Sequence, residues 1–187
     1  MTVAPRFCSL CGGPLELRRP AVEDRLRRVC SACGQVHYEN PKIVTGAACL
    51  FGDRVLLCRR AIEPRAGFWT VPAGFLELGE SPEEGATREA REEARAEIAI
   101  EGLVAVYSIP RLGQVQLMYR ARLLAPQVAP GLESLEVGLF SFGDIPWAEL
   151  AFPTVERLLR RTMTLAGTAP PFIPVCETLG SDDARDE

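Results

Sequence analysis

The chain has 187 residues, of which 47% are apolar, and its 25 acidic and 21 basic side chains leave a net charge of −4. This length can bury one substantial core and a small additional module. The net charge argues against a general nucleic-acid binder, and no stretch reaches the ~18 apolar residues that a membrane helix requires. Seven cysteines, an odd number, and a start without a signal-peptide pattern lead us to expect a cytoplasmic protein.

Two Cys-x-x-Cys pairs open the chain, Cys8 with Cys11 and Cys30 with Cys33, separated by residues 12 to 29. Four thiolates on two such turns satisfy a tetrahedral Zn²⁺, and a segment too small for its own core gains folding energy from the metal. A redox dithiol or a pair of disulfides is the alternative. The spacing resembles a zinc ribbon with a closed, structural site. His37, the only histidine, is then expected to lie in the ribbon or linker and not to bind the metal.

Residues 38–42 indicate a linker, and two apolar strands follow at 43–51 and 54–60 around a turn containing Gly52 and Asp53. Long alternating strands are predicted at 97–109 and 114–124, and another strand is predicted at 137–142. Helices are predicted over 144–150 and 155–165, the second with Thr154 as its N-cap. The segment from Ala166 is rich in proline and acid, and we expect its end to be mobile.

A helix is predicted to start at Pro82, because Ser81 is a good N-cap and Glu84 completes a capping box. Its carboxylates Glu89, Glu92 and Glu93 then project from roughly one side. An alanine stripe on another side allows close approach to a sheet, which places the carboxylates on the rim and not in the core. Arg88 can pair with Glu92 and reach back to Glu80, and Gly74 permits a tight turn before the helix. Taken alone, the charges fit an ordinary solvated helix face.

The full spacing, G-x5-E-x7-R-E-x2-E-E, resembles the signature of Nudix hydrolases, with Gly74, Glu80, Arg88, Glu89, Glu92 and Glu93 at the matching positions. The resemblance implies an α/β/α sandwich around a mixed sheet. We therefore expect a zinc ribbon and linker over 1–40, a Nudix domain over 41–166 and a tail over 167–187. Arg95 departs from the pattern, because the family normally carries glycine there. Arginine in a left-handed cap costs roughly 1 kcal/mol, so we expect a rebuilt helix end.

The resemblance also implies a mechanism, in which Mg²⁺ or Mn²⁺ bridges the diphosphate and an activated water attacks phosphorus. By matching positions, Glu89 and Glu93 are the main metal ligands, Glu92 and the backbone carbonyl of Ala73 are further ligands, and Arg88 orients Glu89. Oxygen ligands of this kind suit hard cations. A later glutamate often assists in relatives, and here Glu133 and Glu136 are both candidates.

The zinc ribbon and the Nudix signature together resemble two groups of zinc-ribbon Nudix proteins. NADH pyrophosphatases usually carry an SQPWPFPxS-like segment after the signature, where this chain has SIPRLGQVQLMYRARL at 108–123. Several segments are instead similar to plant plastid FAD and ADP-ribose pyrophosphatases, so we expect cleavage of FAD or of ADP-ribose. The alternatives are an NADH, NAD or NAD-capped RNA pyrophosphatase, and a non-catalytic module that senses nucleotides or binds nucleic acid. By resemblance we expect a homodimer.

Candidate substrate contacts rest on residue type alone. Arginines near predicted loop ends could neutralise a diphosphate, and aromatic residues could stack on a base, although solvated charge and core packing are the ordinary roles. The candidates are Arg59, Arg60, Arg65 and Arg111 for the diphosphate and Phe68, Trp69, Tyr107 and Tyr119 for the base.

Overall fold

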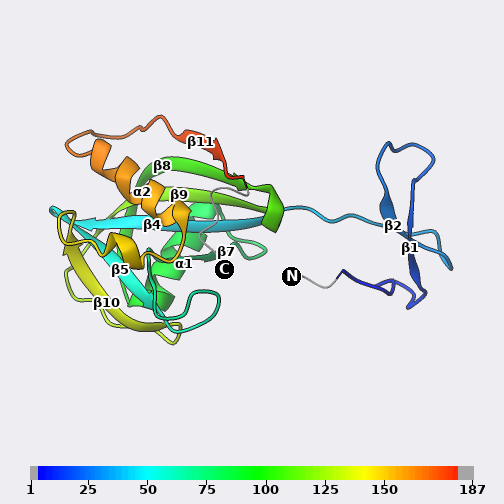
Figure 1. Ribbon diagram of the computed structural model, residues 1–187, viewed down its shortest axis with the longest axis horizontal. Helices are drawn as coiled ribbons and strands as arrows, with labels where there is room; N and C mark the ends of the chain where they lie inside the picture. Colours follow the sequence, from blue (N-terminus) through cyan, green and yellow to red (C-terminus); the bar gives the residue numbers. More distant parts are fainter. Residues whose placement is uncertain (1–3, 181–187) are drawn as a thin grey trace. The chain divides into compact units, whose positions relative to one another are not determined.

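The computed structural model describes residues 4–180. The chain forms two compact units, Met1–Asn40 and Pro41–Glu187 (Figure 1). No helix within the described residues is long and apolar enough to cross a membrane.

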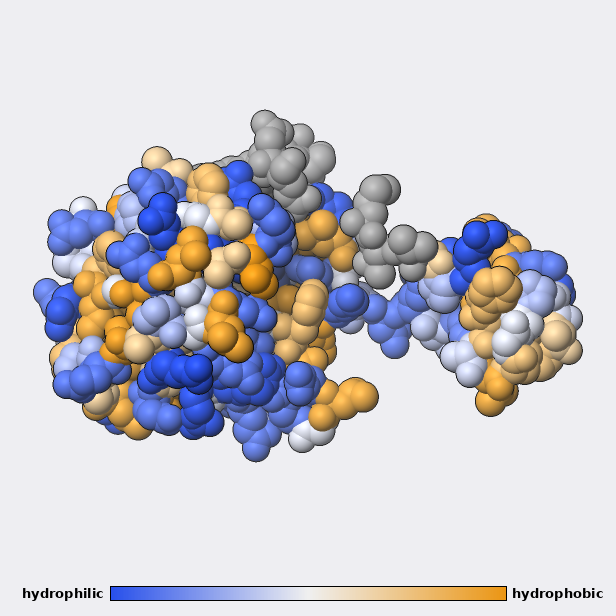
Figure 2. All heavy atoms as spheres, turned by 90° about the horizontal axis from the view of Figure 1, so that it is seen from below, coloured by the Kyte–Doolittle hydropathy of each residue, from blue (hydrophilic) through white to orange (hydrophobic). Residues whose placement is uncertain are grey.

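The first unit is a small antiparallel sheet of β1 (Leu15–Arg18), β2 (Arg27–Cys30) and β3 (Val36–His37). Large apolar side chains remain exposed on it, and Figure 2 shows apolar and polar surface mixed over this unit. A unit of this size cannot bury enough apolar area to fold by packing alone, so its stability depends on the cysteine cluster. The exposed apolar residues are Phe7, Leu10, Leu17, Val22 and Leu26.

The second unit is built on a mixed sheet with the strand order β10-β5-β4-β9-β8-β11 (Figure 1). Strand β4 runs parallel to β9, and β11 runs parallel to β8. Two short strands pair at the side, β6 with β5 and β7 with β4. The strands are β4 (Lys42–Phe51), β5 (Arg54–Arg60), β6 (Trp69–Thr70), β7 (Ala73–Phe75), β8 (Ile98–Ile109), β9 (Gln114–Leu123), β10 (Ser134–Ser141) and β11 (Val175–Thr178).

Helices α1 (Pro82–Ala94) and α2 (Pro153–Thr164) cover opposite faces of this sheet. Successive residues of β5 alternate between two cores: Val55 and Leu57 pack with α2, whereas Leu56 and Cys58 pack with α1. This is the alternation that strand geometry dictates. The expected α/β/α sandwich is thereby confirmed. The alanines of α1 lie fully buried against the sheet, as their stripe predicted.

Three predicted elements differ from the structure. Residues 144–150 contain only a short 3-10 helix, Trp147–Glu149, because Pro146 disfavours helical geometry at the residue before it. Helix α2 begins at Pro153 with Phe152 as N-cap, so Thr154 is not the cap but a buried residue of the first turn. The predicted tail contributes strand β11, while residues 181–187, where mobility was expected, lie outside the described residues.

Candidate functional site

The four ribbon cysteines converge on one point. Their sulfur atoms all lie within 4.8 Å of one another, with Cys8 Sγ 3.8 Å from Cys33 Sγ and Cys11 Sγ 3.5 Å from Cys30 Sγ. These separations are far beyond a disulfide bond, and they approach the ~3.8 Å expected between thiolates around a tetrahedral Zn²⁺. The disulfide alternative is therefore wrong, and the four-sulfur donor set fits zinc. His37 Nε2 lies 3.2 Å from Cys8 Sγ, within the ribbon.

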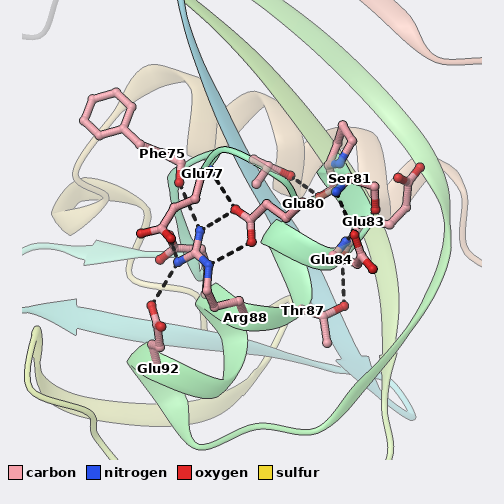
Figure 3. Close-up of polar contacts among 12 residues, drawn as sticks. Phe75, Glu77, Glu80, Ser81, Glu83, Glu84, Thr87, Arg88 and Glu92 are labelled. Atoms are coloured by element: carbon pink, nitrogen blue, oxygen red, sulfur yellow. Dashed lines mark hydrogen bonds and ion pairs between the residues drawn. The ribbon is translucent and has the colours of Figure 1, made fainter.

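Helix α1 starts as predicted. The Glu84 backbone N–H donates to Ser81 Oγ at 3.3 Å, and the Ser81 N–H donates to Glu84 Oε2 at 2.7 Å, which completes the capping box (Figure 3). Pro82 occupies the first turn, where its missing N–H costs nothing. The cap fixes where α1 begins and therefore which of its side chains face the sheet.

Arg88 organises the acidic side chains around it (Figure 3). Its guanidinium donates to both Glu80 oxygens at 3.0 and 2.8 Å, to Glu89 Oε1 at 2.8 Å and to Glu92 Oε2 at 3.0 Å. Arg88 also donates a hydrogen bond to the Phe75 carbonyl at 3.0 Å, which links the helix to the segment that contains Gly74. The Arg88 hydrogen bonds lower the pKa of Glu80 to about 2. The predicted contacts of Arg88 with Glu80, Glu89 and Glu92 are all present.

Two of the three helix carboxylates are buried, which corrects the expectation that they lie on a rim. Glu89 and Glu93 are only 8% and 7% exposed, whereas Glu92 is exposed. Burial, followed by the charge of Glu89, raises the pKa of Glu93 to about 8, and burial also raises the pKa of Glu89. Glu93 Oε2 has no hydrogen-bond partner among the described residues. Adjacent buried carboxylate oxygens without sufficient donors suit a hard divalent cation, so these residues fit such an ion.

Gly74 is needed for a different reason from the predicted tight turn. It lies in β7, paired with Thr45 of β4, and a side chain at this position would collide with the Glu89 carboxylate. The glycine therefore allows the backbone of β7, including Ala73, to approach the acidic cluster closely.

The end of α1 is not rebuilt, contrary to expectation. Arg95 itself adopts the left-handed conformation, with φ 53° and ψ 29°, and its N–H caps the carbonyls of Ala90 and Arg91. The arginine thus accepts the backbone geometry that glycine would take without strain, at a cost of roughly 1 kcal/mol.

The loop between β9 and β10 rests on the end of α1. The N–H of Ala129 donates to the Ala94 carbonyl at 3.0 Å, and the N–H of Gly131 donates to the Glu93 carbonyl at 2.9 Å. A side chain on Gly131 would overlap the Glu92 carbonyl oxygen. This contact sets the position of Glu133, two residues further on.

A cavity of about 770 Å³ opens beside these carboxylates. Its wall includes Glu133, whereas Glu136 lies outside it and pairs with Arg59, their nearest charged atoms being 3.7 Å apart. The structure therefore separates the two candidates that the sequence could not. Burial is the main cause of the raised pKa values of Glu89 and Glu93, and the charge of Glu133 lies close enough to raise both further.

Only some of the proposed substrate contacts reach this cavity. Arg60 and Arg111 line it, but Arg59 and Arg65 do not; Arg65 donates to the Ala151 carbonyl at 3.2 Å and stacks on Phe68. Trp69 is 7% exposed and packs edge-on against Phe140 in the core, so it is not available for stacking. Tyr107 and Tyr119 are likewise buried.

Sequence reasoning did not predict most of the cavity wall, including Phe75 and Arg95. Phe75 is half exposed and Arg95 is exposed, and both line the wall. The sequence feature that could have indicated Phe75 is a large apolar residue directly after Gly74. For Arg95 the signal was its departure from the family pattern.

Family models match both units. One described as Nudix N-terminal covers residues 6–39, and one described as NUDIX domain covers residues 41–152, more than half of the chain. The chain belongs to the Nudix family and carries the N-terminal zinc-ribbon module found in some of its members.

Two individual proteins to which the chain is similar are an NAD-capped RNA hydrolase and an ADP-ribose pyrophosphatase. It is 33% identical over 179 residues to the NAD-capped RNA hydrolase NudC of Stutzerimonas stutzeri, a match that covers 90% of this chain and 60% of that protein. The chain thus spans about 60% of the length of this relative. It is 27% identical over 119 residues to the ADP-ribose pyrophosphatase of Methanocaldococcus jannaschii, covering 62% of this chain and 69% of that protein.

Two solved structures agree with this placement. A NUDIX hydrolase from Nitrosomonas europaea superimposes with a TM-score of 0.87 at 43% identity, covering 94% of this chain and all of that one. An ADP-ribose pyrophosphatase from Streptococcus suis superimposes with a TM-score of 0.59 at 26% identity, covering 74% of this chain and all of that one. The N. europaea match extends over nearly the whole of both chains, so the present arrangement of elements recurs in a solved structure.

Proposed function

We propose that this protein is a metal-dependent pyrophosphohydrolase that cleaves the diphosphate of an ADP-containing dinucleotide or sugar nucleotide. The observation that carries the proposal is the carboxylate cluster of α1: Arg88 holds Glu89 and Glu92, and these two line, with the buried Glu93, a cavity large enough for such a substrate. A purely solvated helix face would not bury the carboxylates of Glu89 and Glu93, and it would not leave Glu93 Oε2 without a hydrogen-bond donor among the described residues.

Each residue then has a role. Glu89, Glu93 and Glu92, together with the Ala73 carbonyl oxygen, would hold Mg²⁺ or Mn²⁺, and a bound ion of this kind neutralises phosphate charge and acidifies water. Arg88 keeps Glu89 in place. Arg60 also lines the cavity, near enough to Glu93 for its charge to act on that carboxylate, and its guanidinium can bind phosphate oxygens.

Glu133 is the candidate general base. Its carboxylate lies in the cavity wall near Glu89 and Glu93, where it would accept the proton of the attacking water as that water adds to one phosphorus; the bond from this phosphorus to the bridging oxygen breaks, and the bridging oxygen leaves on the other phosphate. Arg111 also lines the cavity and would bind phosphate oxygens.

For the substrate, we propose NAD(H) or an NAD-terminated chain first and ADP-ribose second. This order revises the sequence-based preference for FAD, since the relatives named above are described as an NAD-capped RNA hydrolase and an ADP-ribose pyrophosphatase. FAD shares the ADP half with these compounds and stays a candidate. The 108–123 segment, which argued against NADH, forms the end of β8, a 3-10 turn and β9 beside the cavity.

A hydrolysis panel tests the proposal. Purified protein is incubated with NADH, ADP-ribose, FAD or ATP and either Mg²⁺ or Mn²⁺, and AMP release is followed by chromatography, with Glu93→Gln as the inactive control. We expect AMP from NADH or ADP-ribose and little turnover of ATP. Hydrolysis of none of the four by the wild-type protein would instead favour a nucleotide-binding module.

Two partner questions go with this proposal. An NAD-terminated RNA substrate requires RNA binding, which an anisotropy titration at two salt concentrations measures, because phosphate contacts weaken as salt rises. Absence of salt-dependent binding would restrict the substrates to small nucleotides. The homodimer expected by resemblance stays a prediction that light scattering after gel filtration checks.

A further inference from the structure

Arg95 combines three properties that its structural role does not explain. It is held in the left-handed conformation at the end of α1, it is exposed, and it lines the cavity wall. Within residues 4–180 no hydrogen bond or ion pair engages its guanidinium, although its own backbone N–H is well used as a cap. Glycine or asparagine would make the same cap with less strain.

A favourable interaction with the helix dipole is the structural alternative, because cations near helix C-termini are stabilising. That role is already filled by Arg91 in the last turn of α1, which pairs with Glu97 at 2.9 Å and lies outside the cavity. The strained position therefore places an additional, uncommitted positive charge on the cavity wall. Strain retained beside a binding site is a reason to look for a ligand.

The location of Arg95 indicates which part of a ligand it would meet. It follows Glu93 and Ala94, whose carbonyls accept hydrogen bonds from the loop that ends at Leu132 and Glu133. Leu132 is 94% exposed and also lines the cavity, so this part of the wall is its open rim. Arg88 precedes the carboxylates along α1 and lies on their other side, where it contacts the Phe75 carbonyl next to Gly74. A group at Arg95 would thus lie beyond the carboxylates, toward solvent.

We propose that Arg95 binds a phosphate that the substrate carries outside the cleaved diphosphate. This inference rests on the proposed function and narrows its substrate class. Two sources share this chemistry: a monophosphate on the adenosine ribose, as in NADPH, and the first phosphodiester of an NAD-terminated nucleotide chain. A guanidinium suits either, because it offers paired donors to phosphate oxygens.

The test compares substrate pairs that differ only by this phosphate. kcat/KM is measured for NADPH against NADH, and for an NAD-terminated dinucleotide against NAD, with wild type, Arg95→Asn, Arg95→Lys and Arg91→Asn. Asparagine tolerates the left-handed conformation and removes the charge, whereas lysine keeps the charge. Arg91→Asn removes an arginine from the same helix end outside the cavity.

In wild type we expect the phosphate-bearing member of at least one pair to be preferred, and that pair identifies the source. Arg95→Asn should lower this preference about tenfold, the size of one lost charge-assisted hydrogen bond. Arg95→Lys should retain part of it and Arg91→Asn all of it. Equal kcat/KM values within both pairs for wild type, or a wild-type preference that persists in Arg95→Asn, would overturn the proposal.

A binding measurement separates this inference from the proposed function. Calorimetric titration of NADP⁺, of an NAD-terminated dinucleotide and of NAD⁺ into magnesium-free protein needs no turnover. If no substrate is hydrolysed but wild type binds either phosphate-bearing ligand more tightly than Arg95→Asn does, Arg95 binds phosphate and the catalytic proposal fails. If hydrolysis proceeds while Arg95→Asn binds all three ligands as wild type does, only the Arg95 inference fails.

Discussion

Replacing Glu93 with glutamine removes a buried negative charge without changing the volume of the side chain. In the folded protein burial and the nearby Glu89 raise the pKa of Glu93 from 4.5 to about 8. Between these two pH values the folded state holds a proton that the unfolded state has released, so the free energy of unfolding falls as pH rises. At 1.36 kcal/mol per pH unit, the loss over this range amounts to about 5 kcal/mol.

The sign distinguishes Glu93 from Glu80. The pKa of Glu80 is lowered to about 2, so Glu80 contributes stability above pH 4.5 that is lost as pH falls toward 2. Between pH 5 and 8 the slope therefore comes from Glu93 and, with the same sign, from Glu89, whose pKa is also raised. We expect Glu93→Gln to be much less active than wild type yet more stable at pH 8 without magnesium.

The assay is urea unfolding from pH 5 to 9 in magnesium-free, zinc-replete buffer. Both tryptophans, Trp69 and Trp147, lie in the unit Pro41–Glu187, so their fluorescence reports on this unit alone. Glu92→Gln is the matched control, because the Glu92 side chain is 58% exposed. Wild-type stability that is constant or rises from pH 5 to 8 would refute the reasoning, as would equal flattening of the slope by Glu92→Gln.

Four further changes have defined outcomes. Arg88→Lys should lower kcat at least tenfold and reduce stability by about 2 kcal/mol, measured by kinetics and urea unfolding, because lysine cannot bridge three carboxylates. Glu133→Gln should lower kcat by a factor of ~100 or more, and Glu136→Gln should leave it within a factor of about two, since only Glu133 lines the cavity. Gly131→Ala should displace the loop from α1 and lower kcat, with a crystal structure or amide exchange locating the change. Cys30→Ser should reduce bound zinc, measured by elemental analysis, and affect activity only through folding or assembly.

Each of these has an outcome that contradicts it. Full activity of Arg88→Lys would show that the Arg88 network does not position Glu89. Equal losses in the two glutamate variants would remove the distinction drawn from the cavity, and undisturbed exchange in Gly131→Ala would mean that the loop does not need this close contact. Unchanged zinc content in Cys30→Ser would refute the metal ribbon.

Features encoded by neighbouring residues were predicted well. The start of α1 depends on Ser81, Pro82 and Glu84, which are adjacent in sequence, and the strands 43–51 and 54–60 follow from local alternation. Arg88 contacts Glu92 because the two are four positions apart on one helix.

Features that depend on distant segments were not predicted. Glu133 follows a loop that rests on α1 at Gly131, whereas Glu136 lies in β10 opposite Arg59 of β5. The burial of Trp69 depends on Phe140 in a strand far along the chain, and β11 forms only because β8 offers it an edge. No local pattern carries this information, since each contact joins segments that are far apart in sequence.

The most direct test of the central claim is AMP release from NADH and from ADP-ribose by wild-type protein, with and without Mg²⁺, beside Glu93→Gln. The account predicts AMP only when wild-type protein and the divalent ion are both present. Turnover that persists without any divalent ion, or that Glu93→Gln retains in full, would contradict the assignment of this carboxylate cluster as the catalytic centre.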